Sequence, residues 1–190
     1  MTAAKGQKPL SVSLRRGLYL ILTEPRDGYE TLGRWAVEAG LPAVQLRYKG
    51  HNEREYLALA HALRRITKGT GTLFIVNDRP DIALMAQADG VHLGQEDLPA
   101  AEVRRLVGPS MLLGLSTHNL EQVAAANAAP VDYIGCHPVV AIGGLDLERI
   151  QRLKTWPHNV AVIRAVCDAP DPLLAMRAIQ ALFKMNKRRL

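Results

Sequence analysis

Short apolar runs alternate with amphipathic segments along the chain. The apolar runs are rich in leucine, isoleucine and valine, and they occupy residues 17–23, 42–47, 72–78, 89–94, 111–117, 131–135, 138–144 and 159–165. Most are separated by longer segments with apolar residues at helical spacing, such as 29–40, 54–71 and 119–129. The runs predict β-strands and the longer segments predict α-helices. Repeated alternation of strand and helix favours parallel strands joined by right-handed crossovers.

Eight predicted strands with helices between them favour an α/β fold, a (βα)8 TIM barrel, although 190 residues is short for it. A doubly wound open sheet is the alternative, but no GxGxxG motif follows the first strand. We expect one barrel domain at 17–183, a flexible leader at 1–16 and a basic tail at 184–190. The leader lacks the apolar block of a signal peptide, and no apolar run could span a bilayer. We therefore expect a cytoplasmic protein.

The sixth and seventh predicted strands lie almost end to end. Only Cys136, His137 and Pro138 separate their apolar cores. Neighbouring parallel strands need a return connection of roughly a dozen residues or more, usually a helix. The connection between these two strands is therefore missing from the sequence. We expect that a mobile active-site loop has been left out of it, and the alternative is a true deletion that leaves a broken, non-catalytic barrel.

The formal net charge of +6 raises the question of a nucleic-acid partner. The basic residues are spread along predicted helices or gathered in the tail, with little aromatic interleaving and no recognisable binding motif. We therefore expect phosphorylated small molecules as partners, which a positive field would attract, and neither nucleic acid nor a membrane. Cys136 and Cys167 lack metal-ligand spacing and are predicted to be buried thiols.

Polar residues follow four successive predicted strands. In a barrel of this type, the chemistry lies at the carboxyl ends of the strands. The second strand carries three polar residues at a period of two, which predicts that they project to one side. The residues at the four strand ends are Gln45, Arg47 and Lys49, then Asn77 and Asp78, then His92 and Asp97, then Ser116, Thr117 and His118.

These residue types suit the binding of a pyrophosphate. Asp78 and Asp97 are carboxylates without a histidine or cysteine partner at metal-ligand spacing, which favours Mg²⁺. Arginine, lysine and amide groups nearby can bind phosphate oxygens. Gly143 and Gly144 would let backbone N–H groups approach a second phosphate. A catalytic triad of Ser116, His118 and Asp97 is an alternative, but no GxSxG motif supports it.

Six motifs appear in order along residues 17–172: QLRYK (45–49), VNDRPDIAL (76–84), ADGVHLGQEDLP (88–99), GLSTHN (114–119), DYIG (132–135) and PVVAIGGL (138–145). Together they resemble the thiamine-phosphate synthase family. The resemblance implies a (βα)8 transferase that joins a pyrimidine pyrophosphate to a thiazole phosphate, with Mg²⁺ and release of pyrophosphate. It also implies a dissociative mechanism, in which pyrophosphate departs before the thiazole nitrogen attacks.

The resemblance assigns roles to residues by position. Catalytic roles fall to Arg47, Lys49 and Ser116, and Mg²⁺ ligation to Asp78 and Asp97. Substrate contacts are implied for Gln45, Arg47, Lys49, Asn77, Ser116, Gly143, Gly144 and the loop that contains Arg164. We interpret His92 as a residue of the barrel wall and leave the role of His118 open.

Two features depart from the family pattern. The eighth-strand motif usually ends in a serine that contacts phosphate, and here Arg164 stands in its place. The family loop GPxFxTxTK after the sixth strand is absent. A related thiazole tautomerase therefore remains an alternative function, as does a non-catalytic phosphate-binding barrel. The sequence also leaves a homo-oligomer open.

Overall fold

The computed structural model describes residues 13–136, 140–141, 148, 150 and 159–185. Strands and helices alternate through most of this part of the chain, as the apolar pattern predicts. In chain order, the elements are β1 (Gly17–Leu22), α1 (Tyr29–Glu38), β2 (Ala43–Leu46), α2 (Glu53–Thr67), β3 (Leu73–Asn77), α3 (Pro80–Met85), β4 (Gly90–Leu93), α4 (Ala100–Val107), β5 (Leu112–Thr117), α5 (Leu120–Ala128), β6 (Tyr133–Cys136), β7 (Val140–Ala141), β8 (Asn159–Val162), α7 (Arg164–Cys167) and α8 (Pro172–Met185).

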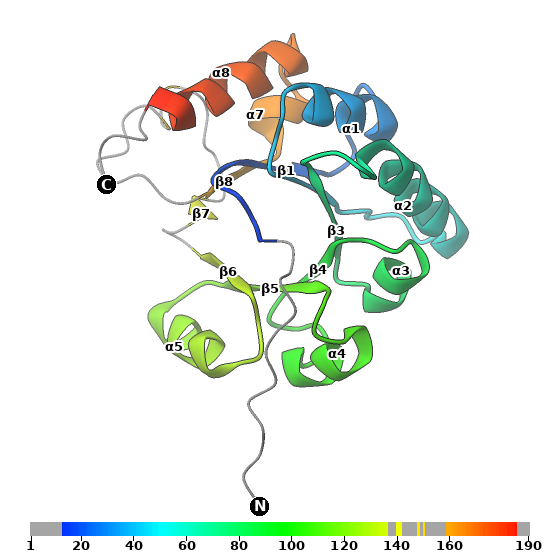
Figure 1. The fold of residues 1–190 in the computed structure, drawn as a ribbon, viewed down its shortest axis with the longest axis vertical. Coiled ribbons are helices and arrows are strands. Elements are labelled where there is room, and N and C mark those ends of the chain that lie inside the picture. Colours follow the sequence, from blue (N-terminus) through cyan, green and yellow to red (C-terminus); the bar gives the residue numbers. More distant parts are fainter. Residues whose placement is uncertain (1–12, 137–139, 142–147, 149, 151–158, 186–190) are drawn as a thin grey trace, which may run out of the picture.

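The strands form one parallel sheet in the order β6-β5-β4-β3-β2-β1-β8-β7. Figure 1 shows them curling around a common centre, with the helices outside. Within the described residues, no backbone ladder joins β6 to β7. The fold is therefore α/β and TIM-barrel-like, as predicted. Closure of the barrel between β6 and β7 stays a prediction.

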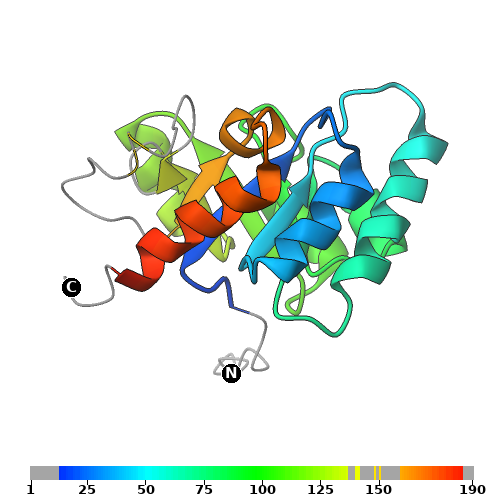
Figure 2. The same ribbon diagram turned by 90° about the horizontal axis from the view of Figure 1, so that it is seen from above.

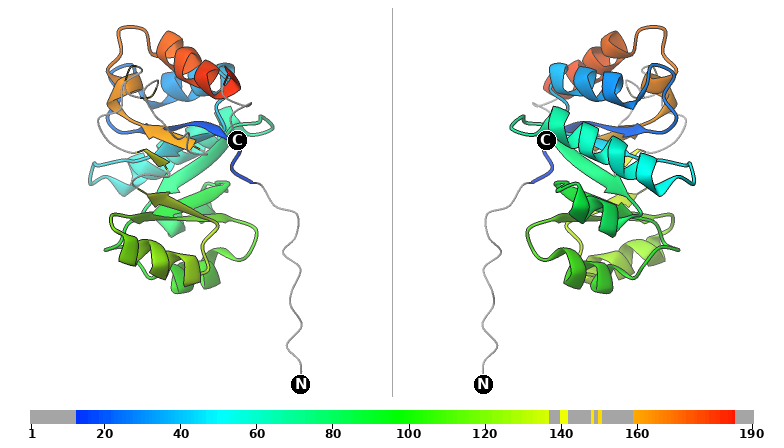
Figure 3. Two further views of the ribbon diagram at one scale, coloured as in Figure 1. Left: turned by 90° about the vertical axis from the view of Figure 1, so that its left-hand side faces the viewer. Right: turned by 90° about the vertical axis from the view of Figure 1, so that its right-hand side faces the viewer.

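The helices cover the outer surface of the curled sheet. Figure 2 shows α8, α1 and α2 side by side along one flank, and contacts join α1 to both of its neighbours. Figure 3 shows α4 and α5 on the opposite flank. At its start, α2 is capped by Asn52, whose side chain accepts hydrogen bonds from two backbone N–H groups of the first turn. Helices that pack outside the strands leave the strand ends free to form a site.

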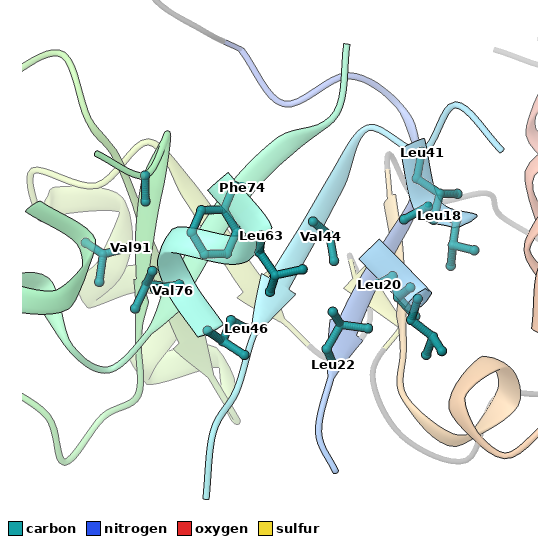
Figure 4. Packing of buried hydrophobic residues seen from close by; sticks show 14 of the residues in the cluster. Leu18, Leu20, Leu22, Leu41, Val44, Leu46, Leu63, Phe74, Val76 and Val91 are labelled. Carbon is teal, nitrogen blue, oxygen red and sulfur yellow. The ribbon is translucent and has the colours of Figure 1, made fainter. Parts of the chain in front are cut away.

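Alternate residues of each strand face two separate apolar clusters, as β1 illustrates. Leu18, Leu20 and Leu22 belong to the cluster that includes helix residues (Figure 4). Tyr19 and Ile21 belong to a smaller cluster of residues from the strands alone. Successive side chains of a strand point to opposite faces. The larger cluster therefore fills the space between sheet and helices, and the smaller one fills the barrel interior.

Two aspartates at the amino ends of strands make equivalent contacts. Asp89, before β4, accepts a hydrogen bond from the backbone N–H of Phe74 at 2.9 Å and pairs with Arg64 of α2 at 2.9 Å. Asp132, before β6, accepts one from a backbone N–H of β5 at 2.9 Å and pairs with Arg104 of α4 at 2.6 Å. Each aspartate therefore ties a helix to two strands at the edge of the sheet opposite the predicted site.

The link between β6 and β7 is short in this chain. β6 ends at Cys136 and β7 begins at Val140, and the residue numbers run through this point without a gap in the full 190-residue sequence. Continuous numbering does not test the expectation of an omitted loop, which stays a prediction. Three residues leave no room for the helix that usually joins neighbouring parallel strands.

Two smaller expectations concern a membrane and the cysteines. Among the helices of the described residues, none is long and apolar enough to cross a membrane. Cys167 is buried, as predicted, and desolvation raises the pKa of its thiol to about 11. The side chain of Cys136 lies outside the described part of the structure.

Candidate active site

The carboxyl ends of β2, β3, β4 and β5 lie along one edge of the sheet. The ladders pair Asn77 of β3 with His92 of β4, and His92 with Gly114 of β5. Ser116 follows two residues after Gly114, so it lies on the same face of β5. The structure therefore brings the ends of these four strands together, with the predicted residues Gln45, Asn77, Asp78, Asp97 and Ser116 on or directly after them.

Asp78 and Asp97 form a pair of neighbouring carboxyl groups at this edge. Asp78 has a left-handed backbone conformation, with φ of 62°, and its N–H donates to the carbonyl of His92 at 2.8 Å. Asp97 accepts a hydrogen bond from the N–H of Gly94 at 2.6 Å. Desolvation, followed by a hydrogen bond to Asp97 and repulsion from its charge, raises the pKa of Asp78 to about 7. The pair is therefore a place where positive charge would be favourable.

The donor set at this pair fits Mg²⁺ bound together with a phosphorylated substrate. Within the described residues, no group of three or more His, Cys, Asp and Glu side chains could hold a metal. Mg²⁺ in such sites is bound through one or two carboxylates, and phosphate oxygens and water complete its coordination. Asp78 and Asp97 supply two carboxylates at the edge where the substrate phosphates are predicted to lie.

Arg47 and Lys49 follow β2 in the loop beyond its last residue. β2 ends at Leu46, so Arg47 and Lys49 lie beyond the strand, and their projection to one side with Gln45 stays a prediction. The N–H of Arg47 donates to the carbonyl of Leu22 at 2.9 Å, and the charge of its guanidinium partly offsets the raised pKa of Asp78. Lys49 is exposed. Both cations are therefore placed beside the strand ends.

Gln45 points into the barrel rather than toward its edge. Its side chain is buried, and Nε2 donates to the hydroxyl of Tyr19 at 3.1 Å. The Tyr19 hydroxyl lies 3.0 Å from the hydroxyl of Tyr133, which lies 3.1 Å from Nδ1 of His92. These polar groups, drawn from β1, β2, β4 and β6, meet across the barrel interior.

His92 and Ser116 form a direct hydrogen bond. Nε2 of His92 lies 2.8 Å from Oγ of Ser116. Desolvation lowers the pKa of His92 to about 4, against a smaller opposing effect of the Asp97 charge. The imidazole is therefore neutral near pH 7. His92 lines the barrel wall, as predicted, and its contact with Ser116 was not anticipated.

Sequence reasoning missed Tyr19, Tyr133 and Gly114. Both tyrosines lie within apolar runs, where they read as ordinary core residues. Gly114 faces them, and a Cβ there would clash with the ring of Tyr133 and with Nδ1 of His92. The polar tip of an inward-facing tyrosine is the one signal that could have indicated them, because a buried hydroxyl needs a partner.

Several predicted residues remain apart from this constellation. Gly143 and Gly144 lie outside the described residues. Arg164 is the exposed first residue of α7, so the predicted eighth strand ends before it. His118 is exposed and its N–H donates to Gln122, whereas Ser116 contacts His92. The described contacts therefore do not support the triad of Ser116, His118 and Asp97.

Comparisons with known proteins find relatives along most of the chain. The chain is 36% identical to the thiamine-phosphate synthase of Vibrio parahaemolyticus, over 87% of this chain and 97% of the relative. It is 37% identical to that of Clostridioides difficile, over 81% and 89%. The solved structure of thiamine phosphate pyrophosphorylase from Pyrococcus furiosus has a TM-score of 0.79 at 29% identity, over 88% of this chain and 96% of that chain. The structure of KGPDC from Streptococcus mutans, at 11% identity and a TM-score of 0.66, shares the fold alone.

The relatives carry positions that this chain lacks. The alignment with the V. parahaemolyticus protein spans 198 positions, and 87% of 190 residues is about 165, which leaves about 33 positions without a residue here. The C. difficile alignment spans 187 positions against about 154 residues, again a difference of about 33. The family model for thiamine monophosphate synthase matches residues 18–138 and ends within the short link between β6 and β7. The chain belongs to the thiamine monophosphate synthase family.

Proposed function

We propose that this chain condenses 4-amino-2-methyl-5-hydroxymethylpyrimidine pyrophosphate with 4-methyl-5-hydroxyethylthiazole phosphate to give thiamine phosphate and pyrophosphate, using Mg²⁺. In a chain of this family, the observation that carries the proposal is the Asp78–Asp97 carboxyl pair beside Arg47. That pair attracts a divalent cation, and the adjoining arginine and lysine attract the phosphates that accompany it.

The reaction breaks one C–O bond and forms one C–N bond. Pyrophosphate leaves with the electron pair of the C–O bond, and the pyrimidine methyl cation that remains is captured by the lone pair of the thiazole nitrogen. Arg47 and Lys49 bind the pyrophosphate oxygens, and Ser116 donates its hydroxyl proton in a hydrogen bond to them. Such groups lower the barrier because they stabilise charge that grows on the leaving group. Mg²⁺, held by Asp78 and Asp97, would supply further neutralisation of that charge.

The pyrimidine and thiazole groups bind at different strand ends in this proposal. Gln45 and Asn77 contact the pyrimidine pyrophosphate. Gly143, Gly144 and Arg164 bind the thiazole phosphate, and an arginine suits that role because it offers two parallel donors. The proposal includes a barrel closed between β6 and β7 and a cytoplasmic enzyme. The curl of the sheet in Figure 1 supports the closure.

A non-catalytic phosphate-binding barrel is the second candidate, and the short link favours it. The loop that is absent after β6 supplies threonines and a lysine to the substrates in the family pattern. A chain without it could retain the phosphate site at β2–β5 and lose turnover. A thiazole tautomerase has less support, because that activity needs neither a pyrophosphate site nor a carboxyl pair for Mg²⁺.

One assay separates these candidates. The purified chain is incubated with both phosphorylated substrates and Mg²⁺, and thiamine phosphate and pyrophosphate are followed over time. We expect thiamine phosphate that requires Mg²⁺ and is lost in an Asp97→Asn variant. Tight binding of the pyrimidine pyrophosphate without product would indicate the binding protein, and conversion of a thiazole precursor alone would indicate the tautomerase.

A further inference from the structure

A continuous chain of hydrogen bonds crosses the barrel interior. It runs from Gln45 through Tyr19, Tyr133 and His92 to Ser116, with successive distances of 3.1, 3.0, 3.1 and 2.8 Å. The first four side chains are drawn from four different strands, and ring contacts at 6.2 Å and 5.5 Å between centroids join Tyr133 to Tyr19 and to His92. Such a chain has a direction, because each hydroxyl donates one proton and each neutral imidazole carries one N–H.

The amide of Gln45 sets that direction. Its Nε2 donates to the oxygen of Tyr19, so the Tyr19 proton is free to point to Tyr133. Tyr133 then donates to Nδ1 of His92, which leaves the imidazole proton on Nε2 and directed at Ser116. If Tyr133 donated to Tyr19 instead, the Tyr19 proton would have no acceptor among the described groups around it. A buried donor without a partner is costly, so the first direction is favoured.

We propose that Tyr19 and Tyr133 are positioning residues that hold His92 as the Nε2–H tautomer and thereby make Ser116 a hydrogen-bond donor to the bound ligand. Oγ of Ser116 accepts from His92, and its own proton remains for an anionic oxygen at the strand ends. The opposite tautomer would take the serine proton and present lone pairs to the pyrophosphate. The direction of the chain stands on the geometry alone, and its use in the reaction rests on the proposed function.

Burial supports a fixed protonation state throughout the chain. Desolvation lowers the pKa of His92 to about 4, so the ring carries one proton near neutral pH. Desolvation raises the pKa of both tyrosines, so each keeps its hydroxyl proton. Gly114 leaves the space in which Tyr133 approaches Nδ1 of His92. Protonation changes near neutral pH therefore do not reverse the direction of this series of hydrogen bonds.

Nitrogen NMR of the histidine ring tests the tautomer directly. The ¹⁵N-labelled wild-type chain is observed at pH 7.5 in a long-range ¹H–¹⁵N correlation spectrum, and the His92 signals are identified by their loss in a His92→Gln variant. We expect a protonated Nε2 and an unprotonated Nδ1. A protonated Nδ1 in the wild-type chain would overturn the proposal, whether or not the chain is active.

Tyr133→Phe tests the contribution of the chain, with Tyr56→Phe as its matched control. Tyr56 is buried, and its hydroxyl donates to the carbonyl of Asn77 at 2.7 Å, outside this hydrogen-bond chain. We expect Tyr133→Phe to shift the His92 ring signals, because Nδ1 loses its hydrogen-bond donor, and Tyr56→Phe to leave those signals unchanged. An unchanged His92 spectrum in Tyr133→Phe would contradict the proposal.

A double-mutant cycle tests whether Tyr133 acts through Ser116. Loss of one oriented hydrogen bond is expected to lower kcat/KM about tenfold in Tyr133→Phe. In a Ser116→Ala background, the same substitution should cost less than about twofold, because the serine that it orients is already gone. Equal losses in both backgrounds would overturn the assigned role. If the wild-type protein forms no thiamine phosphate, the proposed function fails. The histidine ring spectrum still decides the direction of the hydrogen bonds from Gln45 to Ser116.

Discussion

Asp78 is the residue at which the site departs most from ordinary backbone and charge preferences. Its φ of 62° is uncommon for a residue other than glycine, although aspartate and asparagine tolerate it better than most. Its pKa is raised to about 7 by desolvation and by Asp97. Strained backbone and perturbed carboxyl groups are both typical of functional sites. Their coincidence at one residue supports the assignment of this edge as the ligand site.

Asp78→Asn removes the partly buried charge of Asp78 and keeps the backbone conformation, because asparagine also tolerates positive φ. The folded-state pKa of about 7 exceeds the ordinary aspartate value of 3.8, so the folded chain binds more protons between these values and loses stability as pH rises. Without Mg²⁺, Asp78→Asn should therefore melt at a higher temperature than wild type at pH 8, and the difference should vanish near pH 3.5. Thermal unfolding across this pH range measures it. A variant less stable than wild type at pH 8 would refute the account of this pair.

Most of the strand-end residues could be predicted from the sequence, and the interior ones could not. Asp78, Asp97 and Ser116 follow apolar runs, and parallel strands bring their carboxyl ends to one edge. Tyr19 and Tyr133 meet only because β1 and β6, far apart in the sequence, face one another across the barrel. No local sequence pattern predicts that the two tyrosines meet, since each is flanked by apolar neighbours.

At the scale of elements, the aspartate contacts at the amino ends of β4 and β6 join helices to strands. Asp89 and its partner Arg64 are mostly buried, and the aspartate also satisfies a backbone N–H of β3. The amino edge of a barrel generally serves stability rather than chemistry. These contacts therefore allow the carboxyl edge to be tested separately from the fold.

Asp89→Ala should reduce stability without acting on the site. It leaves Arg64 and a backbone N–H unpaired, so we expect a loss of about 3 kcal/mol in the free energy of unfolding. Glu38→Ala is the control, because its pair with Arg177 is exposed and should contribute less than about 1 kcal/mol. Urea unfolding of the two variants gives the comparison. Equal losses would show that the buried contact adds nothing beyond a surface pair.

Element types were predictable, but some element ends were not. The spacing of apolar residues distinguishes strands from helices along most of the described chain. The eighth predicted strand, residues 159–165, instead divides into β8 and the first turn of α7 at Arg164. β8 is paired with β1 only as far as Val162, so its end depends on a partner strand from the other end of the chain. The local sequence does not predict where that pairing stops.

At the scale of the whole molecule, β6 and β7 are separated by only three residues in this chain. The last residue of β6, Cys136, pairs with Thr117 at the carboxyl edge of the sheet. The first residue of β7, Val140, pairs with Asn159, the first residue of β8. Alignments with two relatives leave about 33 positions without a residue in this chain. Under the proposed function, turnover depends on the strand ends that this chain keeps, without the family loop after β6. A site with less cover admits water, which competes for a reactive cation.

Product analysis tests the central claim most directly. The chain is incubated with Mg²⁺ and both substrates, and pyrophosphate, thiamine phosphate and hydroxymethylpyrimidine are quantified together. We predict thiamine phosphate formation with pyrophosphate in excess over it, the difference appearing as the pyrimidine alcohol formed by water. Unchanged substrates after prolonged incubation, with the pyrimidine pyrophosphate bound, would contradict the claim that this chain catalyses the reaction without the family loop after β6.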